Sequence, residues 1–201
     1  LYHLTQQQLA NIMFTLADYD KVTVRKVAQD FNLEVANKAD SQDICFISDH
    51  NYAKFIEERT GIKMRYGNFV DKRGNILGQH KGIYKYTIGQ RKGLGIATGK
   101  PIFISKINVE NNAIVLGDEE DILFKSLIVK NVNFIPVDQL SEATQASVKI
   151  RYGAREAEAI LIPQKENLLK VEFKTPQRAV TAGQSAVFYQ GDLVLGGGVI
   201  Q

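Results

Sequence analysis

"SAVFYQGDLVLGGGVI", residues 185–200, is the stretch of sequence that decides the fold. It contains two short runs rich in apolar residues, SAVFY and LVLGGGVI, which are separated by turn-forming residues. Four similar runs precede it: LIVKNVNFI (127–135), ASVKIRY (146–152), EAEAILI (156–162) and LLKVEF (168–173). Six short runs without a convincing helix predict a small, closed or nearly closed antiparallel barrel. The glycines of LGGGVI then indicate a bulge or a close crossing of strands.

Upstream of the predicted barrel, two segments have the pattern of β-hairpins. NFVDKRGNIL (68–77) is expected to turn at residues 72–74, where a glycine follows two charged residues. IFISKINVENNAIVLG (102–117) is expected to turn near residues 111–112, at a pair of asparagines.

Two helices are expected before these hairpins. Apolar residues at helical spacing predict a helix over about 21–31, with Asp20 as its N-cap. A second helix is expected over about 52–59, capped by either Asp49 or Asn51. The predicted fold class is therefore α+β, with a helical tail, a small β-rich central domain and a C-terminal antiparallel β-barrel.

The charge of the chain is unevenly distributed. The formal net charge is +3, but residues 72–109 contain eight basic residues and no acidic one, with tyrosines interleaved among them. A basic stretch is most often only a solvated face. A mixture of cations and aromatic rings also suits contact with a nucleic-acid backbone, and at this point both readings stay open.

Composition and motifs exclude several other classes of protein. No apolar run approaches the length of a membrane span. The three histidines lie far apart, so no metal site is expected. GLGIATGKP (93–101) is one residue short of a phosphate-binding loop and has Pro101 where that loop needs Ser or Thr, so no nucleotide or cofactor site is assigned to it.

Cys45, in SQDICF (41–46), is the only cysteine of the chain. It cannot form a disulfide within this chain, which favours a reducing, cytoplasmic setting. By default a cysteine between Ile44 and Phe46 is buried and inert. However, a polar loop precedes it and a predicted helix N-terminus follows it, and such a setting lowers the pKa of a thiol.

Five motifs, in this order, resemble the tRNA-specific 2-thiouridylase (MnmA) family: NKADSQDICFI, YTIGQRKGLGI, KIRYG, PQRAVTAGQSAVFY and LGGGVI. The resemblance runs from about Phe14 to the end of the chain. It implies a PP-loop ATP-pyrophosphatase domain, of which 1–59 would be the C-terminal part, a basic central domain (60–117) and a β-barrel domain (118–201). The family's SGGxDS ATP loop and its other catalytic cysteine are absent, so the chain is expected to be a fragment that begins after them.

The resemblance also implies a reaction. Family members use ATP and Mg²⁺ to adenylate C2 of the wobble uridine of tRNA, and here the missing N-terminal region would bind both. The cysteine that matches Cys45 receives sulfur, as a persulfide, from a sulfur-relay donor protein. Either this persulfide attacks C2 directly, or the other cysteine releases the sulfur of the persulfide as sulfide. A disulfide between the two cysteines remains.

The match assigns tRNA contacts to Arg151, Tyr152 and Gln184, and the basic segment adds Arg91 and Lys92 as phosphate contacts. Two plainer readings remain: Tyr152 as a residue of the barrel core, and Gln184 as a turn residue. The chain has Ala182 where the family usually has proline. The competing function is a non-catalytic RNA-binding barrel module in which Cys45 is only structural.

Overall fold

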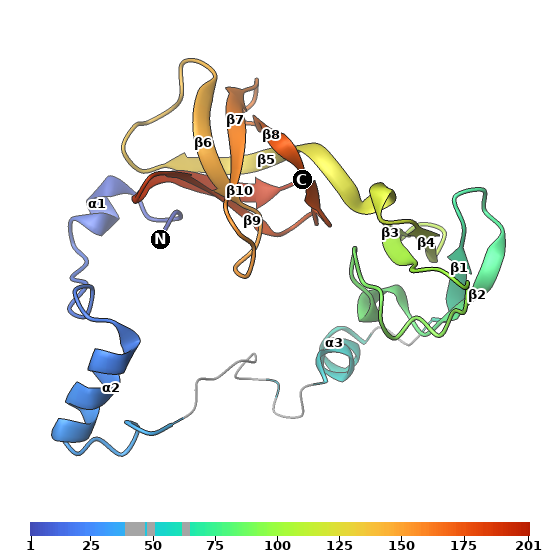
Figure 1. The fold of residues 1–201 in the computed structure, drawn as a ribbon, viewed down its shortest axis with the longest axis horizontal. Coiled ribbons are helices and arrows are strands. Elements are labelled where there is room, and N and C mark those ends of the chain that lie inside the picture. The colour runs from blue at the N-terminus through green and yellow to red at the C-terminus, as the bar shows by residue number, and fades with distance from the viewer. Residues whose placement is uncertain (39–46, 48–50, 62–64) are drawn as a thin grey trace. The chain divides into compact units, whose positions relative to one another are not determined.

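The computed structural model describes residues 1–38, 47, 51–61 and 65–201 (Figure 1). The chain divides into two compact units. One consists of Gln7–Lys63, and the other of Leu1–Gln6 together with Met64–Gln201. Cys45 lies outside the described residues, so its predicted role as the sulfur-accepting cysteine stays a prediction.

The C-terminal strands form the predicted closed barrel (Figure 1). Its strands, in the order in which they neighbour one another, are β10 (Leu193–Ile200), β5 (Leu123–Phe134), β8 (Leu169–Arg178), β7 (Ala157–Pro163), β6 (Thr144–Lys149) and β9 (Ser185–Gln190). All the neighbouring pairs are antiparallel. The barrel therefore leaves no open sheet edge among these six strands.

Alternation along the strands fills the barrel interior. Residues two apart point to the same face of a strand, so every second apolar residue turns inward. In β8, Leu169, Val171 and Phe173 are buried in this way, and in β9 Ala186 and Phe188 are buried. The residues between them, Lys170 and Glu172 in β8 and Val187 in β9, are only partly buried.

The glycine run of β10 permits close contact with neighbouring chain segments. A Cβ on Gly196 would lie 2.2 Å from the backbone oxygen of Asn133, and a Cβ on Gly197 would lie 2.7 Å from Cγ of Tyr2. The register of β10 also shifts between Val194 and Gly196 against β9. The predicted bulge and close crossing are both confirmed.

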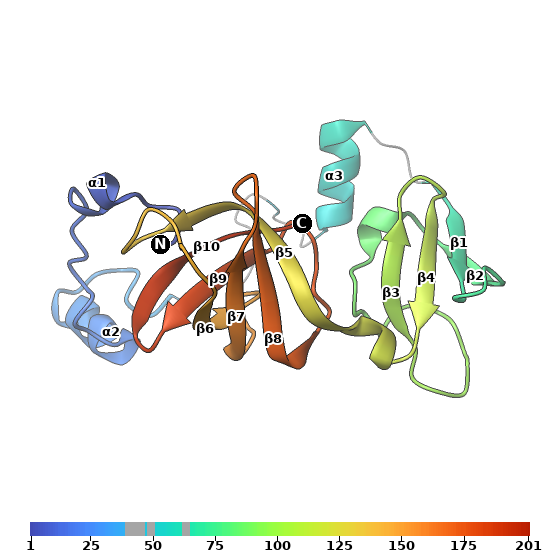
Figure 2. The same ribbon diagram turned by 90° about the horizontal axis from the view of Figure 1, so that it is seen from above.

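The central segment forms a four-stranded mixed sheet with the order β2–β1–β4–β3 (Figure 2). Its strands are β1 (Gly67–Val70), β2 (Ile76–His80), β3 (Phe103–Asn108) and β4 (Ala113–Gly117). The two predicted hairpins are confirmed as the antiparallel pairs β1–β2 and β3–β4. The parallel pairing of β1 with β4, which joins the hairpins into one sheet, was not predicted.

Short helical turns and longer helices complete the chain. The 3₁₀ turns η1 (Ile83–Lys85) and η2 (Glu120–Ile122) follow β2 and β4, and a four-residue helix, α1 (Gln6–Leu9), lies near the start. Helix α2 (Lys21–Asp30) begins at Asp20, whose side chain accepts a hydrogen bond from Thr23 N. Helix α3 (Tyr52–Thr60) begins at Asn51, whose side chain accepts one from Lys54 N. Both predicted helices are confirmed, and Asn51 is the cap of the second.

One predicted strand is shorter than its sequence run. The run ASVKIRY was read as a strand through Tyr152, but β6 ends at Lys149. A turn follows immediately, in which the backbone N–H of Ala154 donates to the oxygen of Arg151 at 3.1 Å. Arg151 and Tyr152 therefore belong to the loop between β6 and β7, which changes their surroundings completely.

Candidate nucleic-acid interface

A hollow forms where the end of β6 lies beside the start of β9. The two strands are antiparallel and pair Lys149 with Val187. Residues that follow Lys149 therefore lie next to residues that precede Val187. The hollow has a volume of about 420 Å³ and is lined by Lys149, Arg151, Tyr152, Gln184, Ser185, Val187 and Tyr189. We call it the Tyr152 pocket; it brings together the three barrel residues assigned to tRNA contact.

Tyr152 projects from the β6–β7 loop with its side chain fully exposed, at 105% relative accessibility. The alternative in which Tyr152 belongs to the barrel core is therefore wrong, because the strand ends before it. An aromatic ring that is exposed in this way contributes little to the stability of the fold. It is suited to stacking on a base or a sugar, since an aromatic face accepts bases of any sequence.

Arg151 is held at the rim of the same pocket. One nitrogen of its guanidinium, Nη2, donates to the backbone oxygen of Arg178 at 3.3 Å. This contact orients the side chain without neutralising its charge, because a carbonyl oxygen is no counter-ion. A positively charged fork held in this way matches the geometry of a phosphate.

Gln184 lies directly after the turn that leads into β9. Its backbone N–H donates to Thr181 O at 3.3 Å, and its backbone oxygen accepts from Ile200 N at 2.8 Å. Gly183 provides the left-handed conformation of the turn, with φ of +85°. The side-chain amide is exposed and makes no hydrogen bond with a described residue. Gln184 is thus a turn residue in its backbone while its amide is free for a ligand.

The pocket also contains residues that the sequence reasoning missed. Lys149 pairs with Glu156 at 3.3 Å, and its Nζ lies 5.3 Å from the ring centre of Tyr189. Alternation along β6 and β9 would have placed Lys149 and Tyr189 on the outer face. Ser185 accepts or donates a hydrogen bond of 2.7 Å with the hydroxyl of Tyr2, 183 residues away. No sequence pattern indicates that contact.

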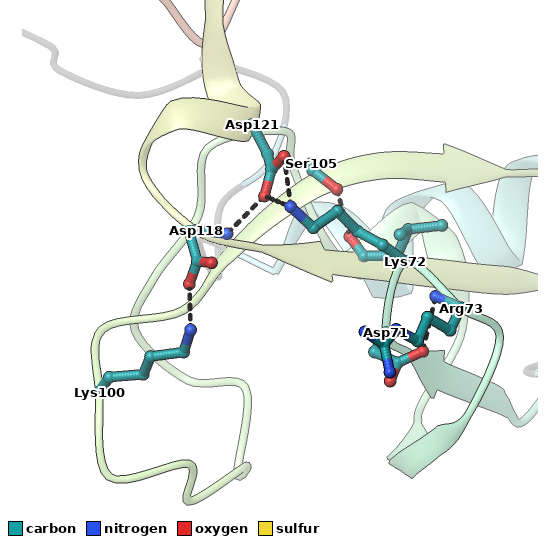
Figure 3. Close-up of polar contacts among 8 residues, drawn as sticks. Asp71, Lys72, Arg73, Lys100, Ser105, Asp118 and Asp121 are labelled. Atoms are coloured by element: carbon teal, nitrogen blue, oxygen red, sulfur yellow. Dashed lines mark hydrogen bonds and ion pairs between the residues drawn. The ribbon is translucent and has the colours of Figure 1, made fainter.

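The basic segment 72–109 is less basic in three dimensions than along the sequence. Lys72 pairs with Asp121 at 2.9 Å and Lys100 with Asp118 at 2.8 Å (Figure 3). Figure 3 also shows Asp121 accepting from the backbone N–H of Asp118. The hydrogen bond with Lys72 lowers the pKa of Asp121 and raises that of Lys72. Asp118 and Asp121 lie after residue 109 in the sequence. A count of charges within residues 72–109 therefore omits them and overstates the free positive charge of the segment.

Arg91 and Lys92 lie in the loop between η1 and β3, where Gln90 fixes the backbone. The Gln90 side chain accepts from Thr87 N at 3.1 Å and donates to Lys92 O at 2.9 Å. Both cations are exposed, and neither forms an ion pair with a described residue. They are not among the residues that line the Tyr152 pocket. The loop presents two free positive charges to solvent.

Other kinds of site find no support in the described residues. Across residues 1–38, 47, 51–61 and 65–201, no group of three or more His, Cys, Asp or Glu side chains is arranged to hold a metal ion. In the same part of the chain, no helix has both the length and the apolar character needed to cross a membrane.

Three family models match successive parts of the chain. Residues 1–49 match the tRNA methyl transferase HUP domain, residues 53–118 the tRNA methyl transferase PRC-barrel domain, and residues 124–200 the aminomethyltransferase beta-barrel domain. Together these matches follow the chain almost from end to end.

Individual relatives are similar over the full 201 residues. Proteins named tRNA-specific 2-thiouridylase MnmA are 52% identical in Acetivibrio thermocellus, 52% in Clostridium beijerinckii and 50% in Clostridioides difficile. In each case the match covers 100% of this chain and 56% of the relative. The chain therefore spans little more than half the length of the relatives it matches.

Proposed function

The chain belongs to the tRNA-specific 2-thiouridylase (MnmA) family, and we propose that it is part of an enzyme that places sulfur at C2 of the wobble uridine of tRNA. The observation that carries this proposal is the Tyr152 pocket. It gathers a guanidinium, an exposed aromatic ring and a free amide on one side of the barrel. That combination offers phosphate pairing, stacking and hydrogen bonding to a single RNA segment.

We assign three domains to the chain. Residues 1–59 form the end of the ATP-pyrophosphatase domain, 60–117 the central domain and 118–201 the barrel domain. The four-stranded sheet lies within the second range and the closed barrel within the third. The family-model bounds lie close to the border between these two ranges, whereas the PRC-barrel match already begins at residue 53, within the first range. The first range carries Cys45.

In this proposal Cys45 accepts sulfur from a donor protein as a persulfide. The reaction requires a thiolate, because the thiolate is the nucleophile in exchange with a donor persulfide. ATP supplies the activation of the uridine C2 position by adenylation. Residues outside this chain would bind ATP and Mg²⁺, since the sequence of the chain contains no phosphate-binding loop.

The catalytic part of the proposal is tested by Cys45→Ser in the full-length enzyme. We expect thiolation of tRNA to be abolished while tRNA binding stays within a few fold of the wild type. A sulfur-sized mass increase after incubation with a persulfide donor should appear on the wild-type protein and be missing from the variant. Retained thiolation by Cys45→Ser would favour the non-catalytic alternative with a structural cysteine.

The RNA-binding part is tested by Tyr152→Ala and Gln184→Ala. Tyr152→Ala should weaken tRNA binding by on the order of 1–3 kcal/mol if the ring stacks on a base. Neither change removes a charge, so the slope of log affinity against log salt should stay that of the wild type. Tyr152→Phe keeps the ring and is the matched control. Wild-type affinity in both alanine variants would exclude Tyr152 and Gln184 as RNA contacts.

A further inference from the structure

A second hollow adjoins the Tyr152 pocket on the outside of the barrel. It has a volume of about 570 Å³ and is lined by residues of the β6–β7 loop, of the start of β7 and of β8. Its charged lining residues are Arg151, Arg155, Lys174, Arg178, Glu156 and Glu158. We call it the Arg155 pocket. Arg151 lines both hollows, so the surface is continuous from Gln184 past Tyr152 to Arg155.

The acids of the Arg155 pocket are already paired with lysines. Glu156 pairs with Lys149 at 3.3 Å, and Glu158 with Lys174 at 2.7 Å. The hydrogen bond from Lys174 also lowers the pKa of Glu158, so this carboxylate stays ionised and matched to its lysine. Neither carboxylate is left to neutralise the arginines.

The arginines differ in how far they are engaged. Arg178 pairs with Glu119 at 3.1 Å, and its guanidinium carbon lies 4.7 Å from the ring centre of Phe103. Arg151 donates only to a backbone oxygen. The exposed guanidinium of Arg155 makes no hydrogen bond or ion pair with any residue that the structure describes. Two positive charges without counter-ions thus lie on the same short loop as Tyr152.

We propose that Arg155 is a further tRNA-binding residue, and that the Arg155 pocket receives a backbone phosphate of the RNA segment that contacts Tyr152. The inference rests on the proposed function. A guanidinium fork offers paired donors to a phosphate, and two such forks next to an aromatic ring fit neighbouring phosphates of a chain whose base stacks on the ring. The sequence reasoning assigned no role to Arg155.

The test compares variants of the full-length enzyme in tRNA binding across a salt series. Losing one phosphate contact lowers the slope of log affinity against log salt by somewhat under one unit, and we expect this for Arg155→Ala. Affinity should fall on the order of tenfold at low salt, because the lost hydrogen bonds are charge-assisted. Arg155→Lys keeps the charge, so it should keep the slope while losing part of the affinity.

Lys130→Ala provides the matched control. Lys130 is an exposed cation on β5 that makes no ion pair with a described residue and lines neither hollow. Its removal should leave the slope unchanged. The variants of Arg155 and Lys130 should unfold at the wild-type temperature, because both side chains are exposed and form no ion pair with a described residue.

Two outcomes would overturn the inference, and both differ from failure of the proposed function. A wild-type slope in Arg155→Ala, with a reduced slope in Arg151→Ala, would show that RNA reaches the Tyr152 pocket alone. Stabilisation of the wild type but not of Arg155→Ala by inorganic phosphate, with unchanged tRNA binding, would assign the hollow to a free anion. If Arg151→Ala, Tyr152→Ala and Gln184→Ala all bind tRNA normally, the proposed function itself fails.

Discussion

At the scale of single residues, Tyr2 joins the start of the chain to the barrel. The ring of Tyr2 is buried at 7% exposure against Gly197, whose missing side chain leaves room for it. Its hydroxyl lies 2.7 Å from Oγ of Ser185, a residue of the Tyr152 pocket. Asn133 adds hydrogen bonds from its Nδ2 to the backbone oxygens of Tyr2 and Leu4, at 2.6 and 3.1 Å. Residues 1–6 thus stabilise the barrel from outside its own strands.

We predict that the Tyr2–Ser185 hydrogen bond contributes about 1 kcal/mol to the free energy of unfolding of the barrel. Tyr2→Phe and Ser185→Ala should each cost about this amount, and the double variant should cost little more than either alone, because both remove the same bond. Chemical denaturation of the four proteins measures the coupling. Tyr189→Phe is the control, since the Tyr189 hydroxyl has no hydrogen bond among the described residues. Strictly additive costs would mean that the two hydroxyls do not interact.

The residues of the Tyr152 pocket could be found from the sequence to different extents. Arg151, Tyr152 and Gln184 came from motif resemblance, since nothing in their local pattern distinguishes a ligand contact from a core or turn residue. A core position for Tyr152 stayed open as an alternative, because an apolar run does not reveal where its strand ends. Tyr2 was out of reach, since its partner lies 183 positions away.

At the scale of elements, the end of β2 contains a completely buried histidine. His80 is 0% exposed and packs edge-on against the rings of Phe69 and Tyr86. Its Nδ1 accepts from Gly82 N at 3.2 Å, so in the neutral tautomer its Nε2–H donates to Asn112 O at 3.1 Å. Desolvation by burial lowers the pKa of His80, which the hydrogen bond to Asn112 offsets only in part. Protonation would also break the bond from Gly82, because Nδ1 would then be a donor.

We predict that the central sheet loses stability as the pH falls below about 6.5, the ordinary pKa of histidine in an unfolded chain. Below that value the unfolded chain binds a proton that the folded sheet does not, so acid favours unfolding. The loss is at most about 1.4 kcal/mol per pH unit, and it ends at the lower pKa of the folded state. Denaturation of the chain from pH 8 to pH 5, followed by hydrogen exchange in β1 and β2, measures it.

His80→Gln should flatten this pH dependence, because glutamine does not titrate, even if it costs stability at every pH. The carboxylates with lowered pKa, such as Asp71 and Asp121, titrate below their ordinary values near 4 and so lie outside this pH window. An identical pH profile for His80→Gln and the wild type would exclude His80 as the cause.

The loop between η1 and β3 is expected to act on tRNA through charge alone. Arg91→Ala combined with Lys92→Ala should flatten the salt slope of tRNA binding by roughly one to two units and weaken all tRNAs alike. Gln90 holds the loop backbone, so the double variant should retain its structure. Lys72→Ala with Lys100→Ala is the matched control, since both lysines are paired with aspartates. If the first variant keeps the wild-type slope, this loop is only a solvated face.

At the scale of the whole molecule, the β-rich parts could be predicted because their core residues lie two apart along each strand. The buried residues Ile114 and Leu116 of the central sheet and Leu169, Val171 and Phe173 of the barrel follow this local rule. Pairings between distant strands follow no such rule, so the parallel contact of β1 with β4 was missed. The free charge of residues 72–109 was overestimated because two of its lysines pair with Asp118 and Asp121, which follow β4 and lie outside the counted segment.

The described residues of the helical unit Gln7–Lys63 belong to neither of the two core clusters, that of the barrel or that of the central sheet. Helix α2 has no buried residue, although its apolar residues were predicted from helical spacing. Val22 is 77% exposed and Phe31, just after the helix, is 75% exposed. Exposed apolar side chains gathered along one element mark a surface that packs against something else. Because residues 1–49 match the HUP domain, we propose that the rest of that domain covers them.

We therefore predict that α2 is only marginally stable in this chain and becomes protected in the full-length enzyme. A ten-residue helix without tertiary packing is short for independent stability in water, so its amides should exchange almost as fast as unprotected ones. Hydrogen exchange followed by mass spectrometry should show fast exchange over residues 21–30 in the chain alone and slow exchange in the full-length protein. Barrel strands such as β8 should be equally protected in both and serve as the internal reference.

Phe31, the apolar residue just after α2, allows a direct test of whether this surface is buried in the full-length enzyme. Phe31→Ser should leave the unfolding of the barrel in the isolated chain unchanged, because Phe31 is not part of the barrel core. In the full-length enzyme the same change should cost stability on the order of 3–5 kcal/mol, as for a large buried ring replaced by a small residue. Equal protection of α2 in both proteins, with no effect of Phe31→Ser in the longer one, would show that its apolar face has no partner in the HUP domain.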